Sequence, residues 1–134
     1  MVTTGLVQYL LTLPAITGLV GNNIAPIPAP VAMSGYPLIT YQMASQNEGY
    51  TLTSPEGLAT ARIVYDCMAE LNPSGYTTAK SIALALKLAL SGFSGTLPDG
   101  TKVWFIEIAN VQDLFNDASF LSVTSVHALV TYQD

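Results

Sequence analysis

Near the start of the chain, apolar side chains recur at helical spacing, at positions Leu6, Tyr9, Leu10 and Leu13. This spacing predicts an amphipathic helix over Thr4–Leu13, and the hydroxyl group of Thr3 or Thr4 is a suitable N-cap. Pro14 ends that helix or opens a second short one through Ile16–Val20, because proline is accepted in the first turn of a helix. Gly21 is the expected end of the second helix.

A longer helix is predicted over Tyr76–Ser91, after the break at Asn72–Gly75. The residues of its apolar stripe are Ala79, Ile82, Ala83, Leu86, Ala89 and Leu90. Gly92 follows as the C-terminal stop. The stripe predicts a helix that packs one side onto a sheet.

Strict alternation, which is typical of strands, is clearest over Gly57–Glu70. There, Ala61, Ile63, Tyr65 and Cys67 alternate with Arg62, Val64, Asp66 and Met68. Three further strands are predicted, over Pro37–Ala44, Lys102–Ile108 and Leu121–Gln133. Asp99-Gly100 is a hairpin signal within the predicted turn Gly95–Gly100.

The remaining segments are predicted as edge or loop. In Ile24–Pro30, every second residue from Pro26 onward is proline, so each lacks the N–H that a central strand needs. We expect an extended edge or polyproline segment there. Ser45–Glu56 is predicted to be a polar loop, and Ala109–Ser119 an acidic loop or short turn.

The order of these elements predicts a single α+β domain spanning residues 1–134. We expect a mainly antiparallel sheet of about four to five strands, with two main helices packed on one face. Neither an internal repeat nor a linker is visible in the sequence.

Charge changes the picture, because no side chain from Met1 to Asn47 carries a formal charge and only 10% of the whole chain is charged. Typical domains have about 25% charged residues, which help to keep protein surfaces apart. The uncharged segment is therefore expected to be buried in a membrane, in its own domain or against copies of itself. A membrane span is disfavoured, because no run of about 20 apolar residues exists. A signal peptide is disfavoured because the basic amino-terminal region is missing.

Candidate catalytic chemistry is sparse, and we expect neither an enzyme nor a bound cofactor. His127 lies mid-strand and is interpreted as a structural residue on the less buried face, since no triad partner is evident. Cys67 is interpreted as a core thiol, because no cationic neighbour is present to activate it. The net charge of −5 and only four basic residues disfavour a non-specific nucleic-acid binder, because phosphate contacts need Lys and Arg.

Three carboxylates, Glu107, Asp113 and Asp117, form a candidate acidic group. EF-hand spacing is absent, so a solvated acidic loop is favoured over a metal site. The composition of an interface, aromatic and poor in charge, is found in the proline-rich edge and near Tyr50. The candidate interface residues are Ile24, Pro26, Ile27, Pro28, Tyr50 and Leu52.

The order of short motifs resembles the tail-completion, or tail-terminator, family of long-tailed bacteriophages and gene transfer agents. The central motifs are Tyr50-Thr51-Leu52, Pro55, Gly57-Leu58-Ala59, Ala61-Arg62-Ile63 and Asp66-Cys67. Upstream lie Leu19-Val20-Gly21, Ile24, Pro28–Pro30 and Pro37–Tyr41; downstream lie Tyr76, Ala79-Lys80, Leu90 and Gly92.

This resemblance implies a structural virion protein, assembled in the host cytoplasm, that forms a hexameric ring at the head-proximal end of the tail tube. Its implied partners are the tail-tube protein and the head–tail connector or stopper protein. DNA would pass through the lumen without specific binding, and we expect Glu107, Asp113 and Asp117 to face that lumen and repel phosphate. Four alternatives stay open: a head-completion or stopper protein, a tail-tube subunit, a small enzyme and a monomeric α+β domain.

Overall fold

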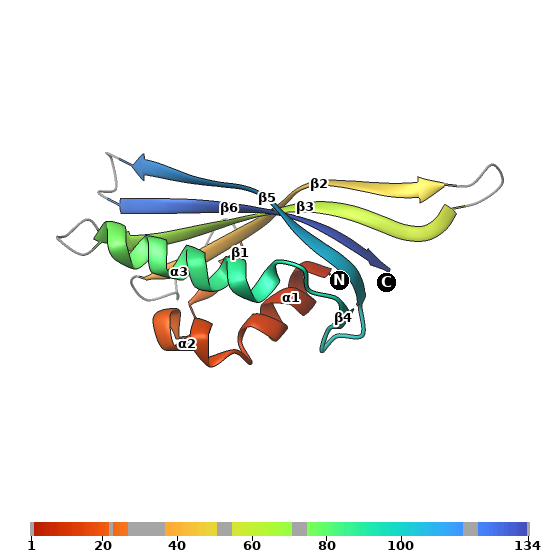
Figure 1. Ribbon diagram of the computed structural model, residues 1–134, viewed down its shortest axis with the longest axis horizontal. Coiled ribbons are helices and arrows are strands. Elements are labelled where there is room, and N and C mark those ends of the chain that lie inside the picture. Colours follow the sequence, from red (N-terminus) through yellow and green to blue (C-terminus); the bar gives the residue numbers. More distant parts are fainter. Residues whose placement is uncertain are drawn as a thin grey trace.

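A computed structural model describes residues 2–21, 23–26, 37–50, 55–70, 75–116 and 121–133 of the protein. It contains a curled six-stranded sheet with the strand order β1-β2-β3-β6-β5-β4 (Figure 1). The strands are β1 (Ile24–Pro26), β2 (Leu38–Tyr50), β3 (Pro55–Glu70), β4 (Gly95–Thr96), β5 (Lys102–Asn116) and β6 (Leu121–Gln133). All neighbouring strands are antiparallel except β1 and β2, which are parallel.

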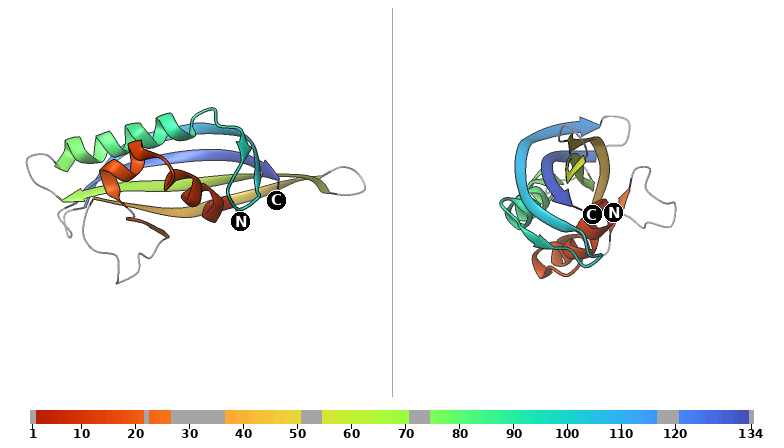
Figure 2. Two further views of the ribbon diagram at one scale, coloured as in Figure 1. Left: turned by 90° about the horizontal axis from the view of Figure 1, so that it is seen from below. Right: turned by 90° about the vertical axis from the view of Figure 1, so that its right-hand side faces the viewer.

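Three helices, α1 (Val2–Leu10), α2 (Pro14–Val20) and α3 (Gly75–Leu90), lie on the same face of the sheet (Figures 1 and 2). The α+β class and the mainly antiparallel sheet are therefore confirmed, with six strands where four to five were predicted. The short helix α2 lies beside the two main helices, as one of the two interpretations of Pro14 predicted. The first helix begins and ends earlier than predicted, since its last residue is Leu10. Pro14 opens α2 as its first residue, and the N–H of Gly21 donates to the carbonyl oxygen of Thr17 at its end.

The predicted polar loop Ser45–Glu56 is wrong over 45–50 and 55–56, and its residues 51–54 lie outside the described residues. β2 continues to Tyr50, and β3 already begins at Pro55, so the two strands form a long hairpin. Figure 1 shows this hairpin extending past the helices. No described helix packs on that part of the sheet. Its residues are therefore mostly polar, and they lack the alternation of apolar and polar residues that would predict a strand.

The predicted acidic loop over Ala109–Ser119 is also wrong as far as Asn116, because β5 runs to that residue paired with β6. A β-bulge interrupts the register between Ile108 and Asn110. The extra residue shifts the alternation by one position, so the apolar residues Ile106, Ile108 and Val111 do not follow a period of two. The pattern therefore hid the second half of the strand.

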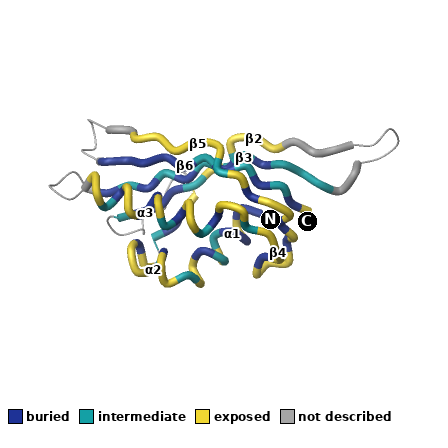
Figure 3. Tube along the Cα trace, in the orientation of Figure 1, coloured by how far each residue is buried: buried dark blue, intermediate teal, exposed yellow. Residues whose placement is uncertain are grey.

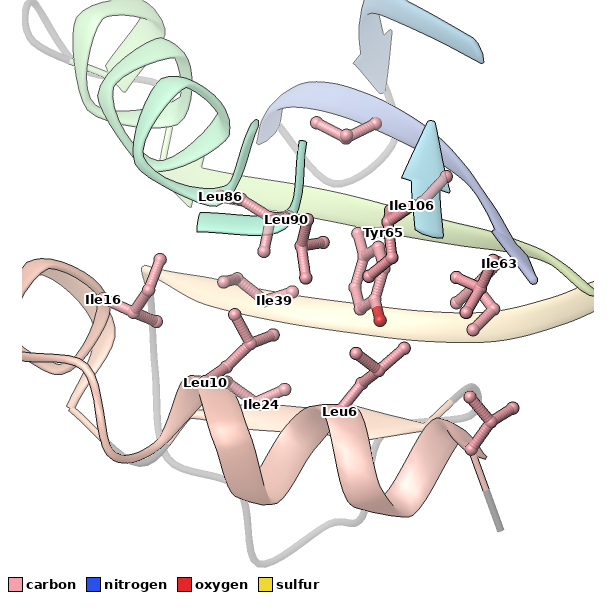
Figure 4. Packing of buried hydrophobic residues seen from close by; sticks show 14 of the residues in the cluster. Leu6, Leu10, Ile16, Ile24, Ile39, Ile63, Tyr65, Leu86, Leu90 and Ile106 are labelled. Carbon is pink, nitrogen blue, oxygen red and sulfur yellow. The ribbon is translucent and has the colours of Figure 1, made fainter. Parts of the chain in front are cut away.

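The core lies between the helices and the sheet (Figure 4). Leu6 and Leu10 of α1 and Leu86 and Leu90 of α3 are fully buried there, against the central strands. The sheet contributes Ile39, Ile63, Tyr65, Ile106, Val126 and Ala128, among others. Burying each large apolar side chain contributes about 1.5–3 kcal/mol, so this layer supplies most of the favourable energy of the fold.

Much of the uncharged amino-terminal segment is buried in the domain itself. Val2, Leu6, Leu10, Ile16, Val20 and Ile24 all belong to the core cluster. No single helix of the described part is long and apolar enough to cross a membrane. The helices α1 and α2 have that length and composition only together, and they meet at 86°.

Two glycines place the turns on either side of β4. Gly92 follows α3 with φ of 75°, and its N–H donates to the carbonyl oxygen of Ile106 at 2.8 Å. Gly100 has φ of 95° in the tight turn that leads to β5. Residues with a side chain rarely adopt positive φ. The predicted hairpin signal at Asp99-Gly100 is therefore confirmed.

Leu86 and Leu88 on α3 form a matched pair for testing the core. Leu86 is fully buried, whereas Leu88 is 73% exposed. We expect Leu86→Ala to lower the free energy of unfolding by about 2–5 kcal/mol, since it leaves a cavity. Leu88→Ala should change it by about 0.5 kcal/mol or less. Urea denaturation at low protein concentration measures both; equal losses would contradict the packing.

Candidate assembly surfaces

The proline-rich edge is only partly presented to solvent. β1 is an edge strand, and the N–H of Ile39 donates to the carbonyl oxygen of Asn23 at 2.9 Å beside it. Ile24 is 7% exposed and packs in the core, whereas Pro26 is exposed. Of this candidate set, Pro26 thus remains available to a partner, and Ile24 already has its contacts within the domain.

The other candidate interface residues are less completely described. Tyr50 is the last residue of β2 and is opposite Pro55 of β3. Ile27, Pro28 and Leu52 lie outside the described residues. Their role in an interface stays a prediction.

The structure does not bring Glu107 and Asp113 together. Glu107 is opposite Leu129 on β6 and Asp113 is opposite Thr124. Leu129 and Thr124 lie an odd number of positions apart on an unbroken strand, so the two carboxylates point to opposite faces of the sheet. The bulge between Ile108 and Asn110 causes this separation. Asp117, the third member, lies outside the described residues.

Asp113 lies on the helix-covered face and joins β5 to the first turns of α3. Its carboxylate is 3.1 Å from the Nζ atom of Lys80, and it accepts hydrogen bonds from Tyr76 and Thr124. The hydrogen bond from Lys80 holds the pKa of Asp113 below its usual range, although partial desolvation opposes this. The same hydrogen bond raises the pKa of Lys80.

Glu107 lies on the face that no helix covers. Its side chain is exposed. On that face, the neighbouring strands carry Arg62, His127 and Leu129, all of them partly buried. Of the predicted acidic group, Glu107 is therefore the described member on the open face of the sheet.

His127 and Cys67 have the surroundings expected of structural residues. His127 Nδ1 is 3.5 Å from Arg62 Nη1, across the β3–β6 pair. Cys67 is buried, and this burial, together with the nearby Asp66, raises the pKa of its thiol to about 12. Among the described residues, no three His, Cys, Asp or Glu side chains gather as a metal site.

An exposed apolar surface on the helices was missed by sequence analysis. Leu84 and Leu88 of α3 are 58% and 73% exposed. They border a groove of about 530 Å³ between α3 and the first two helices. The groove is lined by Tyr9, Leu13, Pro14, Ala15, Ser81, Leu84, Ala85, Leu88 and Ala89. A second apolar row on α3, one turn apart and off the core stripe, was the signal that could have revealed it.

Between the described strands, the two outer edges of the sheet are largely unpaired. β4 covers only Lys102 and Val103 of β5, and β1 covers only Ile39–Tyr41 of β2. Among the described strands, none pairs with the outer edge of 107–116 on β5 or of 42–50 on β2. We call these two stretches the free edges. Neither contains Lys or Pro, the residues that usually protect an edge from pairing.

The exposure pattern agrees with this arrangement. Figure 3 shows that exposed residues are frequent along β5 and along the part of β2 that is coloured beyond β1, and that they recur along α3. On β5, Trp104 and Phe105 are 49% and 53% exposed, close to where β4 stops. The Nζ atom of Lys102 lies 4.6 Å from the centre of the Trp104 ring.

No protein-family model matches this chain, and no curated protein sequence is similar to it. Among solved structures, a chain of the virion of a native gene transfer agent particle is similar, with a TM-score of 0.75. The similarity covers 96% of this chain and 92% of that chain at 16% sequence identity. At this identity the comparison shows a shared fold.

The buried thiol gives a simple test of the core assignment. At pH 8 we expect the native protein to react with a thiol reagent far more slowly than the unfolded protein, because burial and a raised pKa both suppress the thiolate. In denaturant, Cys67 should react fully. Measuring the rate with a chromogenic disulfide checks this, and fast labelling of the native protein would contradict it.

The Asp113–Lys80 contact predicts a titration difference. Because the folded-state pKa of Asp113 is depressed, its contribution to stability is present above its unfolded pKa and is lost as the pH falls through the folded value. In Lys80→Gln, we expect the pKa of Asp113 to rise towards its ordinary value. NMR titration of the carboxyl carbon measures this. Lys87→Gln, on the same helix, is the control and should leave the Asp113 pKa unchanged.

Proposed function

We propose that this protein is a structural virion component, a tail terminator that forms a ring at the head-proximal end of a tail tube. The fold shared with a gene transfer agent virion chain along nearly the whole length is the observation that supports this most. The resemblance of the motif order from Tyr50 to Gly92 to the tail-terminator family gives the more specific role.

The surfaces of the domain are suited to assembly. A cyclic ring requires two different, complementary surfaces on each subunit. The sheet has one free edge at each side, and the helix face carries the exposed pair Leu84 and Leu88. The low charge leaves few like-charge contacts to oppose association.

The described side chains support an assembly role over an enzymatic one. The two candidate nucleophilic or basic groups are engaged in the fold: Cys67 is buried, and His127 is packed beside Arg62 between strands. In the proposed ring, DNA passes without specific binding, which suits a chain of net charge −5. Glu107 on the helix-free face is the described acidic residue placed to line a lumen.

We expect purified protein to form a discrete ring, with six copies as the number implied by the resemblance. Native mass spectrometry across a concentration series measures the copy number. A tail-tube subunit would instead form open-ended stacks, and a monomeric domain would stay at 14.2 kDa.

Purified tail tubes test the terminating role directly. Added during tube assembly, the protein should stop elongation and appear at one tube end in electron micrographs. If the tube keeps elongating with the protein bound along it, a terminator is contradicted and a tube subunit is favoured. If the protein binds only to isolated connectors, a stopper is favoured.

A further inference from the structure

We propose that the ring is closed by direct pairing of the two free edges, the outer edge of β5 in one subunit with the outer edge of β2 in the next. The partner is a second copy of this chain. This inference rests on the proposed function and assigns the subunit contact that builds its ring.

The strand directions allow such pairing. β2 is antiparallel to β3, β3 to β6 and β6 to β5, so β2 and β5 run in opposite directions at the two sides of one sheet. Rotation about a ring axis preserves the direction of every strand relative to that axis. β5 of one subunit and β2 of its neighbour therefore meet antiparallel, and the sheet continues across the contact.

The lengths of the free edges also match. The free edge of β5 spans residues 107–116 and that of β2 spans residues 42–50. A chain with a single free edge would pair in isolated twofold dimers, whereas two different edges produce a head-to-tail contact that can close.

The free edges are displaced along the strand direction. Through the register of β3, Gln46 on β2 is level with Val130 of β6, whereas Asp113 on β5 is level with Thr124, six positions away. Figure 1 shows the same displacement, with the β2–β3 hairpin and the end of β5 projecting in opposite directions. In an untilted ring, only short parts of the two edges would overlap.

A closed barrel requires such a displacement, because its strands tilt by about 35–45° from the axis. Four strands of one subunit are about 19 Å wide, so this tilt shifts neighbouring subunits by about 13–19 Å along the strands, or roughly four to six residues. With that shift, 107–116 and 42–50 face each other along most of their length.

The pairing also places the two faces of the sheet. The layer of three helices occupies more width than the bare sheet, so it fits at the larger radius, outside the barrel. The helix-free face then lines the lumen, with Glu107 on it, and Asp113 lies on the outer side with Lys80. The proposed ring therefore places Glu107 in the lumen, as the sequence predicted, but places Asp113 on the outer side.

Proline substitutions on β5 test the edge. Neighbouring residues of a strand direct their N–H groups to opposite sides, so one of Val111 and Gln112 has its N–H at the free edge. We make Val111→Pro and Gln112→Pro, with Val111→Ala and Gln112→Ala as matched controls. Proline at the position whose N–H pairs with β6 should melt at a lower temperature than its alanine control. Proline at the position whose N–H lies at the free edge should melt at the same temperature as its control, so the melting temperature identifies the edge position.

We expect that variant to raise the concentration at the midpoint of ring formation by about tenfold or more, equivalent to losing one net hydrogen bond or more. The alanine controls should assemble like the original chain. Unchanged assembly of the fold-preserving proline variant would overturn the proposal.

Cysteine pairs provide a second measurement that does not depend on the proline variants. Ser45→Cys with Gln112→Cys places one thiol on each free edge on the helix-free side, and Gln46→Cys with Val111→Cys does so on the helix side. Within one chain these positions are separated by β3 and β6, about 14 Å, which a disulfide cannot span. Oxidation should therefore join different subunits and give a ladder of covalent oligomers on a non-reducing gel.

The control pair Ala15→Cys with Gln112→Cys, on helix and edge, should stay monomeric on the gel. Edge pairing would be overturned if rings of unchanged mass form, neither edge pair gives a disulfide ladder and the proline variant assembles normally. The terminator role would still stand after that result. A chain that stays monomeric alone and with tail tubes would overturn the ring itself. The two failures are thus distinguishable.

Discussion

The packing of one helical layer against one face of the sheet is the interaction on which the rest of the structure depends. Leu6 and Leu10 of α1 and Leu86 and Leu90 of α3 fill the space above Tyr65 and its neighbours. This burial uses up much of the uncharged amino-terminal segment, which would otherwise expose a large apolar surface. The described helices leave the other face of the sheet and both of its sides uncovered.

That asymmetry relates the fold to assembly. A sheet covered on both faces and closed at its edges would behave as an isolated domain. Among the described strands, this sheet instead keeps an unpaired stretch of similar length on each outer edge. The short strands β1 and β4 pair with only one end of β2 and of β5. The stretches of β2 and β5 that no described strand pairs on their outer side are thus the parts that the proposed ring uses.

Sequence patterns predicted the elements that pack on the core and missed those that do not. The stripe of α3 and the alternation of β3 were visible because burial selects apolar residues at a fixed period. The hairpin end of β2 has no helix to contact, so its polar sequence resembles a loop. On β5, one bulge residue broke the period, which hid both the length of the strand and the separation of Glu107 from Asp113.

The bulge in β5 also decides where a change in chain length is tolerated. Ile108 and Asn110 are opposite consecutive residues of β6, so Ala109 is the extra residue. Deleting Ala109 would remove the bulge and leave every later side chain of β5 with its partner and on its face, because the period of two then runs without interruption. A deletion between Asn110 and Asp113 has no extra residue to absorb it, so it would turn the later side chains to the opposite face. Asp113 would then leave Lys80, and the outward and inward surfaces of this part of the strand would be exchanged.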